Sequence, residues 1–107
     1  MSELIKQHID FIRFYTKASP LQQKSLLRYI TVQQLQCLTE VTFNMLKGNI
    51  PLKADERKLL RRDSHHLRIL GNPKKTFSQR KSQLKRLTIH RLLSISLPTL
   101  EDLVVSI

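Results

Sequence analysis

The chain has 107 residues, and its 19 Lys and Arg against 8 Asp and Glu give a formal net charge of +11. This length supports one small domain over residues 1–107, because each half alone would be too short to bury an adequate core. With 40% hydrophobic residues, two glycines and four prolines, the composition excludes wholesale disorder and a turn-rich β-sandwich.

Three helices are predicted in residues 1–52, which we interpret as a mostly apolar scaffold. Apolar residues recur at helical spacing over 3–17 and form an unusually wide apolar face. Ser19-Pro20-Leu21-Gln22 and Thr31-Val32-Gln33-Gln34 both have capping-box character, so they predict the starts of a second and a third helix. Gly48 predicts a left-handed C-cap that ends the third helix. Cys37 lies one position off the apolar stripe, and we expect a buried or half-buried thiol rather than a nucleophile.

Residues 53–95 are predicted to form a basic helical hairpin. A single fourth helix is expected from Lys53 to Leu70, ended by Gly71 through the same left-handed cap as at Gly48. A fifth helix is expected from about Phe77 to Ile95, and a capping box of Thr and Gln precedes it.

The last residues, 96–107, are predicted to form a short apolar and acidic tail. Leu97-Pro98 predicts the end of the fifth helix, and Thr99 is placed to cap a short terminal helix. No hairpin signal for β-strands appears along the chain. The predicted fold class is therefore all-α, a single-domain bundle of four to six helices.

The positive charge is concentrated in one part of the sequence. Residues 53–91 contain thirteen Lys and Arg and three acidic residues, a net charge of +10, whereas residues 1–52 sum to +3. Arg57, Arg61, His65 and Arg68 follow one another at spacings of four, four and three, which predicts a stripe along the fourth helix. Such an excess favours an anionic partner, with nucleic acid first, then an anionic membrane or an acidic protein surface.

Residues 74–86 form the densest basic segment and alternate Lys and Arg with Ser, Thr and Gln, which can donate to phosphate oxygens. We expect free backbone amides near Lys74, Lys75 and Thr76, at the start of the fifth helix, to offer a phosphate site. The predicted nucleic-acid contacts are Arg57, Arg61, Arg62, Arg68, Lys74, Lys75, Arg80, Lys81, Lys85 and Arg86.

Two related alternatives stay open for the same segment. A helix-turn-helix motif would explain two helices joined near 71–75, although this connection is longer than the usual three or four residues. The Lys and Arg clusters also have the composition of a nuclear-localisation signal.

Sequence features of catalysis and cofactor binding are missing. His65 and His66 are adjacent and point about 100° apart on a helix, so they cannot share a metal as an i, i+4 pair can. No glycine-rich phosphate loop and no cysteine pair is present. We therefore expect no enzyme activity, no catalytic residue, no cofactor, no metal and no small-molecule substrate.

The segment Phe43-Asn44-Met45-Leu46-Lys47-Gly48-Asn49-Ile50-Pro51-Leu52, with Lys58-Leu59-Leu60-Arg61-Arg62 and Leu67-Arg68-Ile69-Leu70 after it, resembles a known family. This is the family of small basic helical proteins associated with Polinton/Maverick-type mobile elements and adenovirus-like viruses. The resemblance covers roughly residues 25–93, and it implies a viral or transposon context with a DNA-associated or virion-associated role. Where that family has a Gly-Gly-Phe element, this chain has Leu92-Leu93-Ser94-Ile95-Ser96-Leu97.

These observations predict a non-enzymatic protein that binds the DNA phosphate backbone with low sequence specificity, with DNA favoured over RNA. Such a protein could condense DNA or belong to a virion. The alternative is a protein-interaction module or small capsid-associated subunit that oligomerises through the apolar helix over 3–17 and the tail over 103–107. Because the lone cysteine fits a reducing compartment and no secretory or membrane-spanning segment is visible, we expect an intracellular protein, nuclear or virion-associated, that is not secreted.

Overall fold

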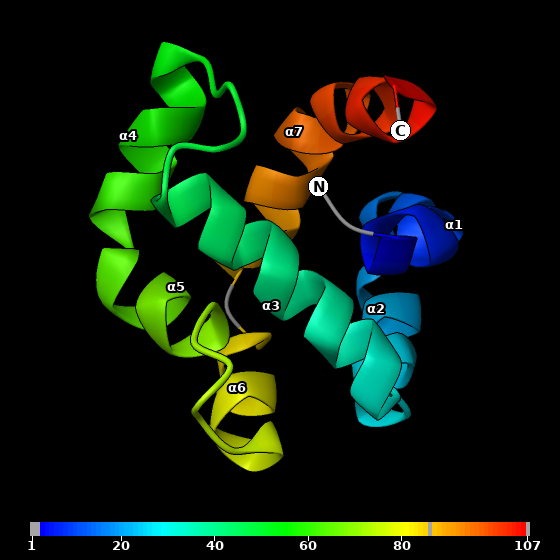
Figure 1. Ribbon diagram of the computed structural model, residues 1–107. Helices are drawn as coiled ribbons and strands as arrows, with labels where there is room; N and C mark the ends of the chain where they lie inside the picture. The colour runs from blue at the N-terminus through cyan, green and yellow to red at the C-terminus, as the bar shows by residue number, and fades with distance from the viewer. Residues whose placement is uncertain (1–2, 86, 107) are drawn as a thin grey trace.

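Figure 1 shows the computed structural model, which describes residues 3–85 and 87–106 and contains seven helices and no strand in these residues. The prediction of an all-α fold is confirmed, whereas the predicted number of four to six helices is too low. In chain order the helices are α1 (Glu3–Lys17), α2 (Pro20–Arg28), α3 (Val32–Leu46), α4 (Ala54–Arg62), α5 (Ser64–Leu70), α6 (Phe77–Gln83) and α7 (Leu87–Ser106).

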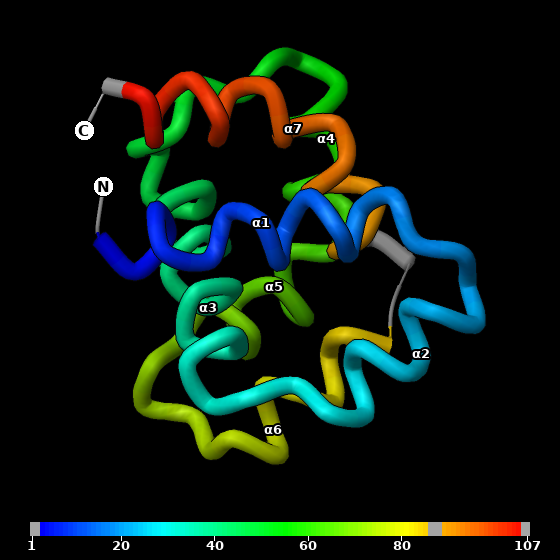
Figure 2. Tube along the Cα trace, turned by 90° about the vertical axis from the view of Figure 1, so that its right-hand side faces the viewer, coloured from blue at the N-terminus to red at the C-terminus, as the bar shows by residue number. Residues whose placement is uncertain are grey.

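Three long helices, α1, α3 and α7, enclose most of the hydrophobic core. α1 packs against both α3 and α7, and Figure 2 shows α1 beside the C-terminal part of α7. The fully buried side chains include Ile12 of α1, Leu38 of α3 and Leu92 of α7. The apolar face of α1 is therefore covered inside the molecule, because Ile5, Ile9 and Tyr15 are buried with it.

The helix starts in the first half of the chain are those predicted. Ser19 and Thr31 each form a complete capping box, in which the hydroxyl accepts from the N3 amide and the N3 glutamine accepts from the cap amide. Gly48 has a φ of +76° and follows α3, as the left-handed cap requires. Cys37 lies fully buried on α3, which confirms the interpretation of its thiol as part of the core.

The predicted single helix from Lys53 to Leu70 is wrong, because the chain changes direction at Asp63 and forms α4 and α5. Asp63 has φ −115° and ψ 29°, outside the helical values. It is both the C-cap of α4 and the N-cap of α5. The change lets α4 pack on α7 while α5 packs on α3 and α6. Leu67 and Leu70 are buried as a result.

Gly71 is needed for space rather than for a left-handed conformation, so the prediction of a second cap like that at Gly48 is wrong. Its φ is −81°. A Cβ atom at this position would lie 3.1 Å from the backbone nitrogen of Phe43 and 3.2 Å from the carbonyl oxygen of Leu67. Glycine therefore allows the end of α5 to approach the backbone of α3.

The predicted fifth helix is also divided, into α6 and α7, with Leu84 as the C-cap of α6. Arg86, between the two helices, lies outside the described residues. Pro98 does not end a helix as predicted, because α7 continues through it to Ser106 and no separate helix begins at Thr99. The tail over 96–107 is therefore not an independent element.

Burial against α1 explains why α7 continues through a proline. An internal proline costs about 3 kcal/mol because it removes a backbone hydrogen bond. On either side of Pro98, Leu97 and Leu100 are buried, and burying one leucine stabilises by about 2 kcal/mol. Arg13 of α1 also donates from Nε and Nη2 to Glu101 at 3.2 and 3.0 Å, which fastens the second half of α7 to α1.

Candidate nucleic-acid interface

The first part of the basic surface is the outward side of α4. Arg57, Lys58, Arg61 and Arg62 are all exposed there, and the spacings of three and four residues among them make them neighbours on the helix surface. The carboxylate of Glu56 points the other way, is 1% exposed and accepts a hydrogen bond from the Ser96 hydroxyl at 3.1 Å. One of the few acidic residues in this region is thus withdrawn from the surface.

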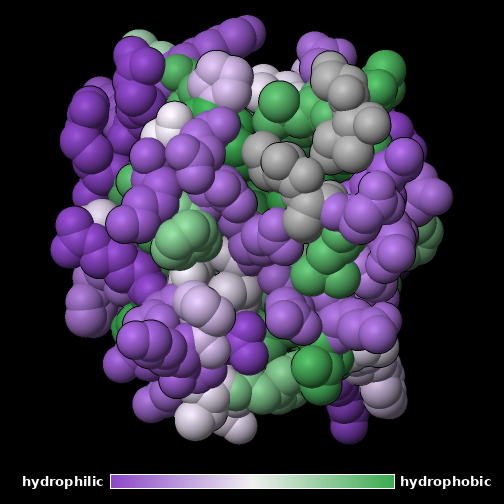
Figure 3. Space-filling model, in the orientation of Figure 1, coloured by the Kyte–Doolittle hydropathy of each residue, from purple (hydrophilic) through white to green (hydrophobic). Residues whose placement is uncertain are grey.

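The predicted stripe does not follow one helix axis, because the break at Asp63 separates its members. Arg57 and Arg61 belong to α4, whereas His65 and Arg68 belong to α5, and all four are exposed. In Figure 1, α4 and α5 lie along one side of the molecule and α6 lies at the adjoining end. Figure 3 shows hydrophilic residues gathered over the side that α4 and α5 occupy.

The connection between α5 and α6 adds two exposed cations, Lys74 and Lys75. The expected free amides are absent from this connection, so the predicted phosphate site at the start of the fifth helix is wrong. The amide of Lys74 donates to the Asn72 side chain at 3.0 Å, that of Lys75 to the Asn72 carbonyl at 3.1 Å, and that of Thr76 to Gln79 at 3.0 Å. An anion at this connection would therefore contact the side-chain ammonium groups of Lys74 and Lys75 rather than the backbone amides.

Arg80 has a structural position on α6. Its Nη1 donates to the hydroxyl of Thr39 at 3.0 Å, and Thr39 is buried on α3. Its Nε is buried without a hydrogen-bond partner among the residues that the structure describes. The guanidinium therefore joins α6 to α3, and it is less accessible to a phosphate than the exposed arginines of α4.

Lys81 and Lys85 lie apart from the side formed by α4 and α5, beside the second helix of the chain. The ammonium of Lys81 donates to the backbone carbonyl of Arg28 at 3.1 Å and lies 5.7 Å from the ring centre of Phe77. Lys85 is exposed. Both residues line a cavity that Lys24 and Arg28 line from the opposite wall.

Lys24 and Arg28 were missed by the sequence analysis because they lie some fifty residues before the basic segment. Their i, i+4 spacing on α2 places both on one side of that helix. Their position opposite Lys81 and Lys85 depends on tertiary packing alone. No local sequence pattern could have shown it.

The exposed cations of α4 and α5 have no acidic partner among the residues described. Within the ranges 3–85 and 87–106, both ion pairs involve Arg13, which contacts Asp10 at 2.7 Å and Glu101 at 3.0 Å. The exposed cations of α4 and α5 therefore face solvent, where an anion can reach them.

The helix-turn-helix alternative rests on two helices joined near 71–75. The structure has two seven-residue helices on either side of this connection, α5 and α6. Each is about 10 Å long at 1.5 Å per residue.

In the described part of the chain, no group of three or more His, Cys, Asp or Glu is placed to hold a metal ion. Burial raises the pKa of the Cys37 thiol to about 12, with a smaller contribution from Glu40, so the nucleophilic thiolate is disfavoured. None of the helices described is both long and apolar enough to cross a membrane.

Comparisons of this chain with protein-family models, with curated proteins and with solved structures give no match.

Proposed function

We propose that this chain is a non-enzymatic nucleic-acid-binding protein that contacts the phosphate backbone of DNA with low sequence specificity. The observation that supports the proposal best is the set of exposed cations on α4 and α5 that form no ion pair with any described residue. Binding to phosphates would release counterions from DNA, and the affinity would then depend steeply on salt.

The contacts proposed first are Arg57, Arg61 and Arg68, because all three are exposed. Arg57 donates from Nη1 to the Leu52 carbonyl at 2.9 Å, and the other N–H groups of its guanidinium are the ones proposed to contact phosphate. Arg62, Lys74 and Lys75 extend the same surface. Arg80 contributes less in this proposal because its guanidinium is occupied by Thr39. Arg86 lies outside the described residues, and its predicted role stays a prediction.

A role in DNA condensation or in a virion belongs to the same proposal. It is supported by the resemblance to the proteins of Polinton/Maverick-type elements and by the excess of one charge sign, which suits packing against any DNA sequence. A nuclear or virion-associated location would follow from that role.

The test is duplex-DNA binding measured by fluorescence anisotropy across a salt series. If the triple variant R57Q/R61Q/R68Q loses three phosphate contacts, the log–log salt slope becomes shallower by about 2.7, and affinity at 0.1 M salt falls about 500-fold. The control K6Q/K17Q/K47Q removes the same charge from exposed positions outside α4–α6. The slope of the control should stay close to that of the parent chain.

Two results would contradict the proposal. One is no detectable binding of the parent chain at about 50 mM salt, where electrostatic contacts are least screened. The other is an equal change of slope in the two triple variants, because net charge rather than the α4–α5 surface would then explain the binding.

A second candidate function, self-association or docking on another protein, is favoured by exposed apolar residues near α2. Leu21, Tyr29 and Phe14 are 76%, 75% and 58% exposed, more than an isolated small domain needs to leave in water. On α1, which was expected to form the interface, Ile5, Ile9, Ile12 and Tyr15 are buried, so Phe14 is the apolar side chain that this helix leaves exposed to a partner. Light scattering of the parent chain and of L21Q/Y29Q tests this function, since a dimer that the double variant abolishes would support it.

A further inference from the structure

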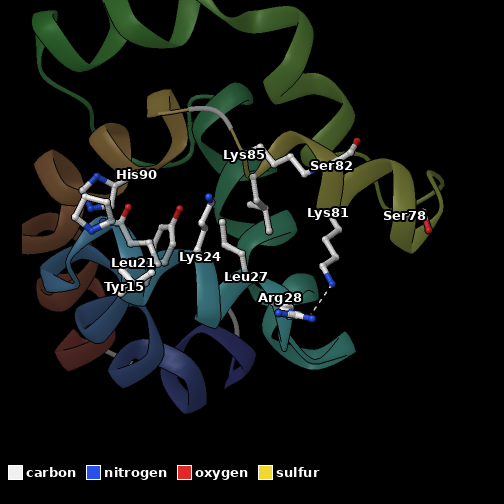
Figure 4. A pocket seen from close by; sticks show the side chains of 13 residues that line it. Tyr15, Leu21, Lys24, Leu27, Arg28, Ser78, Lys81, Ser82, Lys85 and His90 are labelled. Carbon is white, nitrogen blue, oxygen red and sulfur yellow. Dashed lines mark hydrogen bonds between the residues drawn. The ribbon is translucent and has the colours of Figure 1, made fainter.

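A cavity of about 840 Å³ lies between α2 and α6, and its inner end is closed by residues of α1 and α7. Figure 4 shows its side chains, with those of α2 on one wall and those of α6 on the other. This volume is in the range of sites that bind small organic molecules, about 300–1,000 Å³.

The inner end of the cavity is mainly apolar, and the His90 ring there is already hydrogen-bonded. Tyr15 and Leu84 are buried there, and the neighbouring Leu21 and Leu27 come from α2. Burial raises the pKa of Tyr15 to about 12, so its phenol stays uncharged at neutral pH. The ring of His90 lies edge-on to Tyr15, and its Nε2 is bonded to the carbonyl of Thr16 at 3.1 Å.

The outer part of the cavity is positively charged on both walls. Lys24 and Arg28 of α2 face Lys81 and Lys85 around it, and the described lining residues include no Asp or Glu. The walls are joined at one end, where the Lys81 ammonium donates to the carbonyl of Arg28 at 3.1 Å. The site thus has a mainly apolar inner end and a cationic rim.

α2 itself lacks a full packing partner in the described chain. It contains no buried residue, and Leu27 is only half-buried although it points into the cavity. A ligand with an aliphatic part would cover Leu21, which is 76% exposed, and the half-buried Leu27, and it would fill the space between α2 and α6.

We propose that this cavity binds a free single-chain amphiphile, an aliphatic chain that ends in a phosphate or carboxylate group. The aliphatic chain lies against Leu27, Leu84 and Tyr15, and the anionic head is held by Lys24 and Lys85. The phosphate backbone of DNA does not suit this site, because its leucine surface would be left against a polar polymer. An acidic helix from a partner would need a groove open along its length for a diameter of about 10 Å, and the contact between Lys81 and Arg28 closes one end.

This inference is independent of the proposed DNA binding, since it uses other residues and another kind of contact. It also predicts a dependence on chain length. Each further buried methylene should tighten binding about fourfold, a step of about 0.8 kcal/mol, until the cavity is filled.

The probe is dodecyl phosphate below its micelle concentration, titrated into the full chain by calorimetry, with octyl and decyl phosphate as the length series. We expect one molecule per chain, tightening about fifteenfold for each two methylenes. Dodecyltrimethylammonium, which reverses the head charge, and inorganic phosphate, which lacks the chain, should each bind at least tenfold more weakly.

The variant K24Q/K85Q should weaken dodecyl phosphate at least tenfold, and L27Q should abolish the dependence on chain length. The matched control R57Q/R61Q removes two charges from exposed positions on α4 and should change the affinity less than twofold. Lys81 is kept in all variants because it joins the two walls. Thermal melts show whether L27Q is folded, and K24Q/K85Q tests the site without altering the apolar surface.

Several outcomes would overturn the proposal. Binding of several molecules per chain, weakened equally by K24Q/K85Q and R57Q/R61Q, would show adsorption to net charge. Equal binding of the cationic amphiphile would show an apolar patch without charge selection. Tighter binding of an acidic amphipathic peptide than of dodecyl phosphate would assign the cavity to a protein partner instead.

Discussion

α3 and α6 begin with the same local signal and have very different places in the molecule. Thr31 and Thr76 each cap a helix and pair with a glutamine three residues on, with nearly equal amide-to-hydroxyl distances of 3.0 and 3.1 Å. α3 then runs for 15 residues and buries seven of them, whereas α6 runs for 7 residues and buries none. The capping box sets where a helix begins, and tertiary burial decides how long and how firmly held it is.

The largest difference between the two helices should appear when one apolar side chain is truncated in each. Leu38 of α3 is fully buried, so L38A should lower the free energy of unfolding by about 3 kcal/mol through lost burial and an unfilled cavity. Phe77 of α6 is only half-buried, and F77A should cost about 1.5 kcal/mol. Urea denaturation measures both. An equal or larger loss in F77A would show that α6 is as firmly packed as α3.

The second difference concerns alkaline pH, because α3 contains a buried thiol and α6 does not. The folded-state pKa of Cys37 is about 12, above the value of about 8.5 for an unfolded cysteine. Below pH 8.5 the thiol is neutral in both states. As pH rises from there towards 12, the unfolded state ionises first, and stability falls by about 1.4 kcal/mol per pH unit.

The measurement is the free energy of unfolding of the parent chain and of C37A between pH 8 and 11. Subtracting the slope of C37A removes the contributions of lysine and tyrosine. Equal slopes would contradict the buried position of the thiol. A thiol reagent provides a second check, since Cys37 should react at pH 8 only after the chain has unfolded.

The third difference lies in how α6 is attached, through a polar contact instead of buried leucines. R80M removes the hydrogen bond from Arg80 to Thr39 and should cost about 2 kcal/mol, because hydrogen bonds from charged groups are the stronger ones. The double-mutant cycle with T39V separates this contact from other effects of each substitution. A coupling energy near zero would mean that the contact between Arg80 and Thr39 does not help to hold α6 on α3.

The smallest difference is expected from the two caps themselves. T31A and T76A each remove the same hydroxyl contact, worth about 1 kcal/mol. T31A should lower the global free energy of unfolding by that amount. T76A should mainly increase hydrogen exchange of the α6 amides, because a short helix without buried residues can open on its own. A full global loss in T76A would place α6 in the same cooperative unit as α3.

The same contrast explains how much of the fold could be predicted from sequence. Helix starts at Ser19, Thr31 and Thr76 depend on residues next to one another, and all three are where the capping boxes predicted them. The breaks at Asp63 and Leu84 carry no glycine or proline. They arise because α5 and α7 must turn to reach their packing partners, which local sequence does not encode.

The continuation of α7 through Pro98 could not be predicted for a related reason. An internal proline has a local cost, but the burial of Leu97 and Leu100 in the core outweighs it. The sequence around Pro98 does not show whether its neighbours are buried.

The candidate site, too, has features that could be predicted from sequence and features that could not. Charge density and exposure on α4 could be predicted from helical periodicity, and so could the exposure of Lys74 and Lys75. The occupied amides at 74–76 depend on Asn72 and Gln79, whose contacts form only in the folded turn. The pairing of α2 with α6 around a cavity required the whole fold.

The chain's two glycines impose different chemical demands, one of handedness and one of volume. At Gly48 the Cβ of an L residue would meet nothing within 4 Å, and only the φ of +76° opposes it; a D-alanine, which favours positive φ, should stabilise the chain by up to about 1 kcal/mol when placed there by chemical synthesis. At Gly71, with its φ of −81°, an L-alanine would meet the Phe43 backbone at 3.1 Å. A mirror-image residue therefore suits the first position, while the second accepts a side chain only if α3 and α5 move apart.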